Sequence, residues 1–159
     1  MREIEVTRRV KEFLTDNSWT MIAVHYPGSQ AGMYVHDSNR KGKGSKGSVV
    51  IDIVAERDTD FLLIESKSRF EMFDVDKLVK VTTSPNYRGS LNERLRTDRF
   101  KSFRILRGIA VAQINLETLR FPYEFLVFKV GTRGIGIYGT YSGTSLSGIF
   151  PSYATLWEV

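Results

Sequence analysis

The chain has 159 residues, of which 42% are hydrophobic and 26% charged, so we expect one domain with a substantial core. It contains no cysteine, which excludes disulfide bonds, thiolate zinc sites and a cysteine nucleophile. The net charge is +5, no stretch approaches the roughly 18 to 20 apolar residues of a membrane span, and the first residues lack the apolar core of a signal peptide. We therefore expect a soluble cytoplasmic protein with no membrane partner.

The first predicted element is an amphipathic helix over residues 3–16. About 100° of rotation per residue places Glu3 on the face that carries its apolar side chains, which are Val6, Val10, Phe13 and Leu14. A strand over 19–26 follows and stops at Pro27-Gly28. A short extended piece over 32–35 then leads into a polar, Gly- and Lys-rich loop over 37–48.

Two apolar runs, 49–55 and 61–67, predict the paired strands of a β-hairpin. They contain three charged residues, Asp52, Glu65 and Lys67, whose burial is costly unless each finds a partner. Asp52 reaches the face of Glu65 only if the loop has an even number of residues. Asp58-Thr59 as a two-residue turn, or Arg57 to Asp60 as a four-residue loop, would place them opposite each other. An odd loop would separate the two carboxylates unless a bulge restored the alternation.

After the hairpin we expect a helix over 70–81, with Phe73, Leu78 and Val81 facing inward, ended by Ser84-Pro85-Asn86. A short helix over 91–100 and strands over 105–114 and 123–130 come next. From Gly131 onward the composition indicates short strands and turns.

This order of elements predicts an α/β fold with a mixed central sheet flanked by helices and extra short C-terminal strands. We expect a single domain over 1–159, with a core over about 3–114 and a β-rich extension over 115–159.

Positive charge is concentrated in two stretches, 37–48 and 86–107, while the remainder of the chain is net negative. Such clustering favours a polyanionic partner, most plausibly nucleic acid, although two solvated basic segments are the simpler alternative. The residues we expect to contact nucleic acid are Arg40, Lys41, Lys43, Lys46, Arg88, Arg94, Arg96, Arg99 and Lys101.

If Asp52 and Glu65 converge, they can bind a hard divalent cation through oxygen, with Mg²⁺ the natural choice and Mn²⁺ a substitute. The metal would activate a water molecule and offset charge on a scissile phosphate. Lys67 would orient or deprotonate the water or stabilise the transition state, and the Ser66 carbonyl could be a further metal ligand. The alternative is a surface ion pair between Glu65 and Lys67 with Asp52 in a turn.

Ile51-Asp52, a short hairpin and Glu65-Ser66-Lys67 together resemble the PD-(D/E)XK nuclease superfamily. The pattern is similar to that of archaeal-type Holliday-junction resolvases and restriction endonucleases. The resemblance implies a restriction-endonuclease-like αβββαβ core, and Glu3 matches a glutamate that many members place on the first helix. Ile51 stands at the usual proline, and Phe73 to Lys80 has no counterpart of the glutamine found in some subfamilies.

We therefore expect a Mg²⁺-dependent deoxyribonuclease with Asp52, Glu65, Lys67 and Glu3 in its site, and by resemblance a homodimer. Structure-specific and sequence-specific cleavage, and an RNA substrate, stay open. The rivals are a nucleic-acid-binding module that keeps the fold without catalysis, and a structural protein that does not bind nucleic acid.

Overall fold

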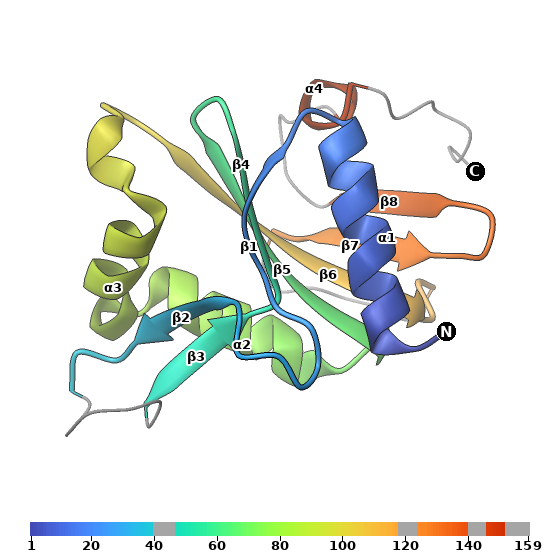
Figure 1. The fold of residues 1–159 in the computed structure, drawn as a ribbon, viewed down its shortest axis with the longest axis horizontal. Coiled ribbons are helices and arrows are strands. Elements are labelled where there is room, and N and C mark those ends of the chain that lie inside the picture. The colour runs from blue at the N-terminus through green and yellow to red at the C-terminus, as the bar shows by residue number, and fades with distance from the viewer. Residues whose placement is uncertain (40–46, 118–123, 140–145, 152–159) are drawn as a thin grey trace.

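The computed structural model describes residues 1–39, 47–117, 124–139 and 146–151. In chain order (Figure 1) the elements are α1 (Glu3–Asp16), β1 (Thr20–Val24), β2 (Met33–His36), β3 (Ser48–Ile51), β4 (Ile53–Arg57), β5 (Asp60–Arg69), α2 (Met72–Thr83), α3 (Pro85–Leu95), a 3-10 turn η1 (Thr97–Arg99), β6 (Arg104–Gln113), β7 (Leu126–Val130), β8 (Ile135–Gly139) and α4 (Leu146–Ile149). None of the described helices is long and apolar enough to cross a membrane.

A mixed sheet forms the centre of the molecule, which confirms the predicted α/β class. The described strands form a six-stranded sheet in the order β1-β4-β5-β6-β7-β8. The pairs β5-β6 and β6-β7 are parallel and the other neighbours antiparallel. β2 and β3 pair separately as a two-stranded antiparallel ribbon beside α3 (Figure 1).

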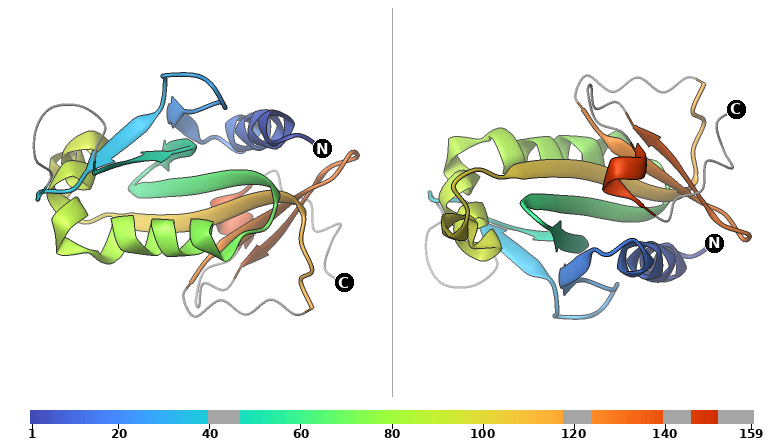
Figure 2. Two further views of the ribbon diagram at one scale, coloured as in Figure 1. Left: turned by 90° about the horizontal axis from the view of Figure 1, so that it is seen from below. Right: turned by 90° about the horizontal axis from the view of Figure 1, so that it is seen from above.

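Helices cover both faces of this sheet. The side chains of α1 pack on one face against Leu62 and Ile64 of β5, whereas α2 and α3 pack on the other against Phe61 and Leu63. Figure 2 shows α1 and α2 on opposite sides of β5 and β6. The alternation of side chains along β5 thus supplies both halves of the core.

The β4-β5 hairpin has the even two-residue turn that the sequence permits. Ile53 pairs with Ile64 and Arg57 with Asp60, which leaves Asp58-Thr59 as the turn. Asp58 has a φ of 54°, a left-handed conformation that aspartate tolerates and that tight hairpin turns favour. This register brings the residue before β4 alongside Glu65.

The single predicted strand over 49–55 is wrong, because the chain changes sheets at Asp52. β3 pairs with β2 in the ribbon, and β4 joins the main sheet directly afterwards. Asp52 therefore occupies the junction between two sheets instead of the middle of one strand. Apolar residues continue on both sides of Asp52, so the sequence pattern does not reveal the junction.

Two predictions about the helices are also wrong. α3 begins at Pro85 and not near Leu91, since Ser84 caps it by accepting a hydrogen bond from the Asn86 N–H at 3.4 Å. Phe73, expected to face inward, is 72% exposed, while Leu78 and Val81 are buried as predicted.

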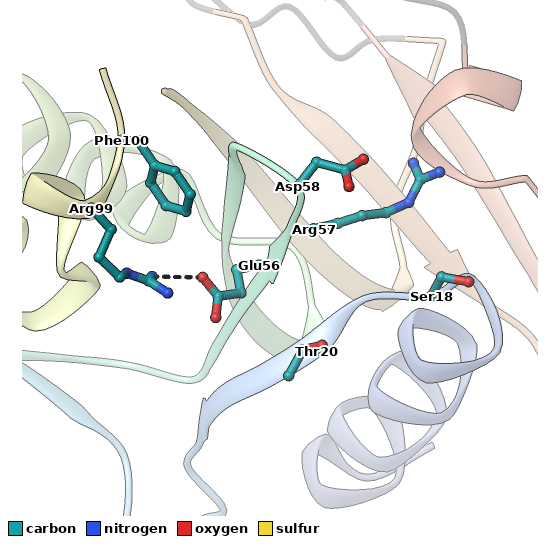
Figure 3. A pocket seen from close by; sticks show the side chains of 7 residues that line it. All are labelled: Ser18, Thr20, Glu56, Arg57, Asp58, Arg99 and Phe100. Carbon is teal, nitrogen blue, oxygen red and sulfur yellow. Dashed lines mark hydrogen bonds and ion pairs between the residues drawn. The ribbon is translucent and has the colours of Figure 1, made fainter. Parts of the chain in front are cut away.

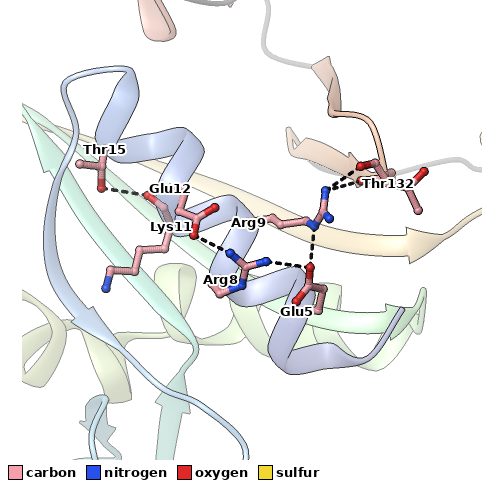
Figure 4. A network of polar contacts seen from close by, with 8 residues as sticks. Glu5, Arg8, Arg9, Lys11, Glu12, Thr15 and Thr132 are labelled. Carbon is pink, nitrogen blue, oxygen red and sulfur yellow. Dashed lines mark hydrogen bonds and ion pairs between the residues drawn. The ribbon is translucent and has the colours of Figure 1, made fainter.

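The first half of α1 is attached to the β7-β8 hairpin by polar contacts (Figure 4). The Arg9 guanidinium donates to the carbonyl oxygens of Gly131 and Thr132 at 3.0 and 3.1 Å and to Glu5 at 2.8 Å. Arg8 also pairs with Glu5, and these contacts hold the pKa of the Glu5 carboxyl below its ordinary value. The start of α1, which carries Glu3, is thereby fixed relative to the sheet.

We predict opposite stability changes for alanine at two glycines. A Cβ on Gly108 in β6 would lie 2.9 Å from Phe128 and 3.1 Å from Ile64, so Gly108→Ala should lower the free energy of unfolding by about 1 to 3 kcal/mol. Gly89, inside α3, would have no atom within 4 Å of an added Cβ, so Gly89→Ala should raise it by about 0.5 to 1 kcal/mol. Urea unfolding measures both, and equal effects would contradict the packing described for β6.

Candidate active site at the end of strand β5

Asp52 and the second half of β5 are joined by a direct hydrogen bond. The Ser66 N–H donates to Oδ2 of Asp52 at 2.9 Å, and the Asp52 carbonyl accepts from the His25 N–H at 2.7 Å. Asp52 is 6% exposed. The structure therefore brings the first predicted carboxylate to the Glu65-Ser66-Lys67 segment and holds it there at both its backbone and its side chain.

Glu65 is a buried carboxylate with one engaged and one free oxygen. It is 1% exposed, its Oε2 accepts from the Lys77 ammonium at 2.8 Å, and its Oε1 has no hydrogen-bond partner among the described residues. Burial, and the neighbouring Asp52 charge, raise the pKa of Glu65 to about 8 despite the opposing effect of Lys77. The alternative of a surface pair between Glu65 and Lys67 is wrong, because Glu65 is buried and Lys77 is its partner.

Lys67 faces Glu3, which the resemblance places near the site. Its Nζ lies 3.5 Å from Oε2 of Glu3, and both side chains are about one third exposed. Burial lowers the pKa of the Lys67 ammonium, yet the net effect of its surroundings is a pKa above the ordinary value. The opposing effect comes from the nearby carboxylates of Glu3, Asp74, Asp52 and Glu65. Lys67 is therefore a cation at neutral pH and is suited to stabilise negative charge instead of accepting a proton.

α2 contributes two residues that the sequence pattern did not place in the site, Asp74 and Lys77. Asp74 is buried, its Oδ2 has no partner among the described residues, and burial raises its pKa. The available signal was helical spacing, since Asp74, Leu78 and Val81 fall at i, i+4 and i+7 on one stripe. An acidic residue on the inward stripe of an amphipathic helix points to a polar site beneath it.

The predicted nucleic-acid contacts are only partly described. Arg40, Lys41, Lys43 and Lys46 lie outside the described residues. Arg88 and Arg94 are exposed on α3, which packs beside β2 through a hydrogen bond from the His36 N–H to the Ser90 hydroxyl. Arg96 and Lys101 are exposed near η1, at the C-terminal end of α3.

Arg99 is not brought to the carboxylates. Its guanidinium donates to Glu56 at 2.8 Å and stacks on Phe100 at 4.8 Å. Glu56 pairs with Phe61, four residues before Glu65, which is about 13 Å along the strand. Arg99 ties η1 to the hairpin.

A polar cavity of about 460 Å³ occupies that distant end of the hairpin (Figure 3) and is lined by Ser18, Thr20, Glu56, Arg57, Asp58, Arg99 and Phe100. Its two arginines are engaged: Arg57 donates to the carbonyl oxygens of Gly148 and Ile149, and Arg99 to Glu56. None of the carboxylates at the end of β5 lines it.

The donor set at the end of β5 contains buried carboxylates, the ligand type that a hard divalent cation prefers. Buried, unpartnered oxygens on Glu65 and Asp74 beside Asp52 are groups that a cation would stabilise. Within the described part of the chain no group of three or more histidine, cysteine, aspartate or glutamate side chains is arranged to bind a metal ion. Mg²⁺ commonly uses one or two carboxylates and several waters, so this arrangement is compatible with it.

Comparison with known proteins gives no relative: no family model matches the chain, and no curated protein or solved structure matches it. The function of the protein is therefore inferred from its residues and their geometry.

We predict that Glu65 makes stability fall as pH rises. The folded protein raises the pKa of Glu65 to about 8 from 4.5, so it binds more protons than the unfolded chain between these values. Relative to Glu65→Gln, the free energy of unfolding of wild type should fall by at most about 1.4 kcal/mol per pH unit across this window. Above the window the difference should stay constant. Urea unfolding from pH 5 to 9 in EDTA tests this, with the exposed Glu93→Gln as control. Parallel curves for wild type and Glu65→Gln would contradict it.

Proposed function

We propose that the protein is a metal-dependent nuclease that hydrolyses DNA phosphodiester bonds. The observation that carries the proposal is the convergence of Asp52, Glu65 and Lys67 at the end of β5, where the Ser66 N–H joins Asp52 to the Glu-Ser-Lys segment at 2.9 Å. The resemblance to the PD-(D/E)XK superfamily rests on these same residues. Support also comes from the element order: α1, the antiparallel strands β1, β4 and β5, the helices and the parallel strand β6 match the αβββαβ order that the resemblance implies, if the β2-β3 ribbon is counted as an insertion.

The proposed roles follow from the environment of each side chain. Asp52 and Glu65, with the Ser66 carbonyl, would bind Mg²⁺ or Mn²⁺, which when bound supplies Lewis acidity and an activated water. Lys67, kept protonated by its carboxylate neighbours, binds a phosphate oxygen and stabilises the charge that develops there. Glu3 positions the Lys67 ammonium from α1.

DNA is the proposed partner because positive charge is concentrated in the segments that flank these strands. Arg88 and Arg94, exposed on α3, would contact backbone phosphates. A homodimer is proposed from the resemblance alone, since cleavage of both strands of a duplex requires two sites.

A second candidate is a nucleic-acid-binding module without catalysis. The observation that favours it is the Lys77–Glu65 ion pair of 2.8 Å, which already gives one oxygen of the buried carboxylate a cationic partner. In this case the charges at the end of β5 would have a structural role only.

The proposal predicts metal-dependent cleavage that requires Lys67. Lys67→Ala removes the cation that stabilises the transition state and should lower the cleavage rate about 100-fold or more. A panel of linear duplex, supercoiled plasmid, single strand and four-way junction DNA with Mg²⁺ or Mn²⁺ measures the rate. Lys11→Ala, on the exposed side of α1, should cleave like wild type.

Cleavage that persists in Lys67→Ala, or that needs no metal, would reject this site. DNA binding by wild type without cleavage of any substrate would favour the binding module.

The basic surface of α3 gives a separate prediction. Replacing Arg88 and Arg94 by alanine removes two phosphate contacts, so the slope of log affinity against log salt should decrease in magnitude by about 2. Fluorescence anisotropy with a labelled duplex measures this slope between about 50 and 200 mM salt. Over that range a protein that makes about 6 to 10 phosphate contacts loses several orders of magnitude in affinity, so the change is measurable. The double variant Arg8→Ala, Lys11→Ala loses the same charge from α1 and should keep the wild-type slope. Equal slopes in all three proteins would exclude α3 from the DNA interface.

A further inference from the structure

One stripe of α2 borders its buried face and carries an aromatic ring and two lysines. Phe73, Lys77 and Lys80 fall at i, i+4 and i+7, next to the inward stripe of Asp74 and Leu78. Because Asp74 occupies the inward position, the adjacent Phe73 is turned outward and is 72% exposed. The exposed Phe73 is not isolated, because Val49 and Val50 line the same cavity as its ring and give this surface an apolar character.

This stripe forms one wall of a cavity of about 420 Å³ between α2 and β3. Val49 and Val50 of β3 line the opposite wall, and Asp76 and Lys80 also line the cavity. Lys77 belongs to this lining and at the same time donates to Glu65. The cavity is therefore connected to the candidate active site by a single side chain.

The lining selects the chemistry of an occupant. An exposed ring on one side and two valines on the other suit a flat, largely apolar group. The Asp76 carboxylate can accept hydrogen bonds from amino or imino N–H groups, and the Lys80 ammonium, which lies 5.6 Å from the ring of Tyr87, can pair with an anion. A nucleobase carries such a flat face with N–H donors, and it is attached to an anionic phosphate.

Base pairing determines which form of nucleic acid fits. In an intact duplex the base faces are stacked on each other, and the surface presents hydrated phosphates that gain nothing from valine or phenylalanine. An unpaired nucleotide exposes its face and stacks on aromatic side chains without sequence preference. The charge complementarity between a phosphate and Lys80 favours this occupant over an apolar protein segment.

We propose that the cavity between β3 and α2 binds an unpaired nucleobase stacked on Phe73, so that the substrate is a single strand or a branched DNA with unpaired nucleotides beside the cleaved bond. This inference rests on the proposed nuclease function and specifies its substrate class. Phe73 is a binding residue here, and Lys77 connects the occupied cavity to Glu65.

The test uses binding without cleavage, on the full chain in EDTA. The probes are a single-stranded oligonucleotide with one 2-aminopurine and the duplex that its complement forms. Wild type should quench the 2-aminopurine of the single strand by stacking, and Phe73→Ala should bind it at least about fivefold more weakly, the effect of losing one stacked base. Phe73→Trp should restore binding and quenching.

Met72→Ala is the matched control, since Met72 is a neighbouring exposed residue at the start of α2. It should bind both probes like wild type, and duplex affinity should be the same in all four proteins. Thermal unfolding monitored by circular dichroism checks that Phe73→Ala is folded, as expected for so exposed a side chain.

Equal single-strand affinity in wild type and Phe73→Ala, with DNA still bound, would overturn the inference and leave the nuclease proposal intact. No binding of either probe by wild type would overturn both. A dimer in sedimentation that Phe73→Ala converts to a monomer would also overturn the inference, because the ring would then bind a second copy of the chain.

Discussion

The burial of the Glu65 carboxylate is the constraint on which the rest of the site depends. A charge at 1% exposure costs several kcal/mol unless it is compensated, and here Lys77 compensates one oxygen only. Well-packed apolar residues at both positions would often give a more stable core, so stability alone does not account for this pair. The pKa of about 8 has the same cause, because burial of Glu65 favours its protonated form near neutral pH.

The Glu65–Lys77 pair agrees with how α2 lies on the sheet. The helix directs the stripe of Asp74, Leu78 and Val81 toward the core, where all three are buried, and in this orientation Lys77 reaches Glu65. The remaining positions near the start of the helix then face β3 and solvent. The exposure of Phe73 is a consequence of this helix orientation, which also forms the cavity beside β3 and brings Lys77 to the site at the end of β5.

Much of this arrangement could be predicted from the sequence where local rules decide. The helix over 3–16 follows from periodicity, whereas hairpin parity only permits the two-residue turn at Asp58-Thr59 that places Asp52 beside Glu65, and the structure selects it. The change of sheets at Asp52 could not, because alternation shows which side chains share a face and not which strand they pair with. Hydrophobicity alone assigns Phe73 to the core and therefore does not predict that it faces outward. In the structure the inward position of this turn of α2 is occupied by Asp74.

The two lysines near the carboxylates have different environments, and this separates their roles. Lys77 is 18% exposed and directly bonded to Glu65, so its charge is committed to the protein. Lys67 is 32% exposed, stands 3.5 Å from Glu3, and has no closer ion-pair contact among the described residues. A longer contact at greater exposure is weaker and more easily exchanged for a phosphate oxygen. Of the two cations, Lys67 is therefore the one free to reach a substrate, while Lys77 keeps Glu65 buried.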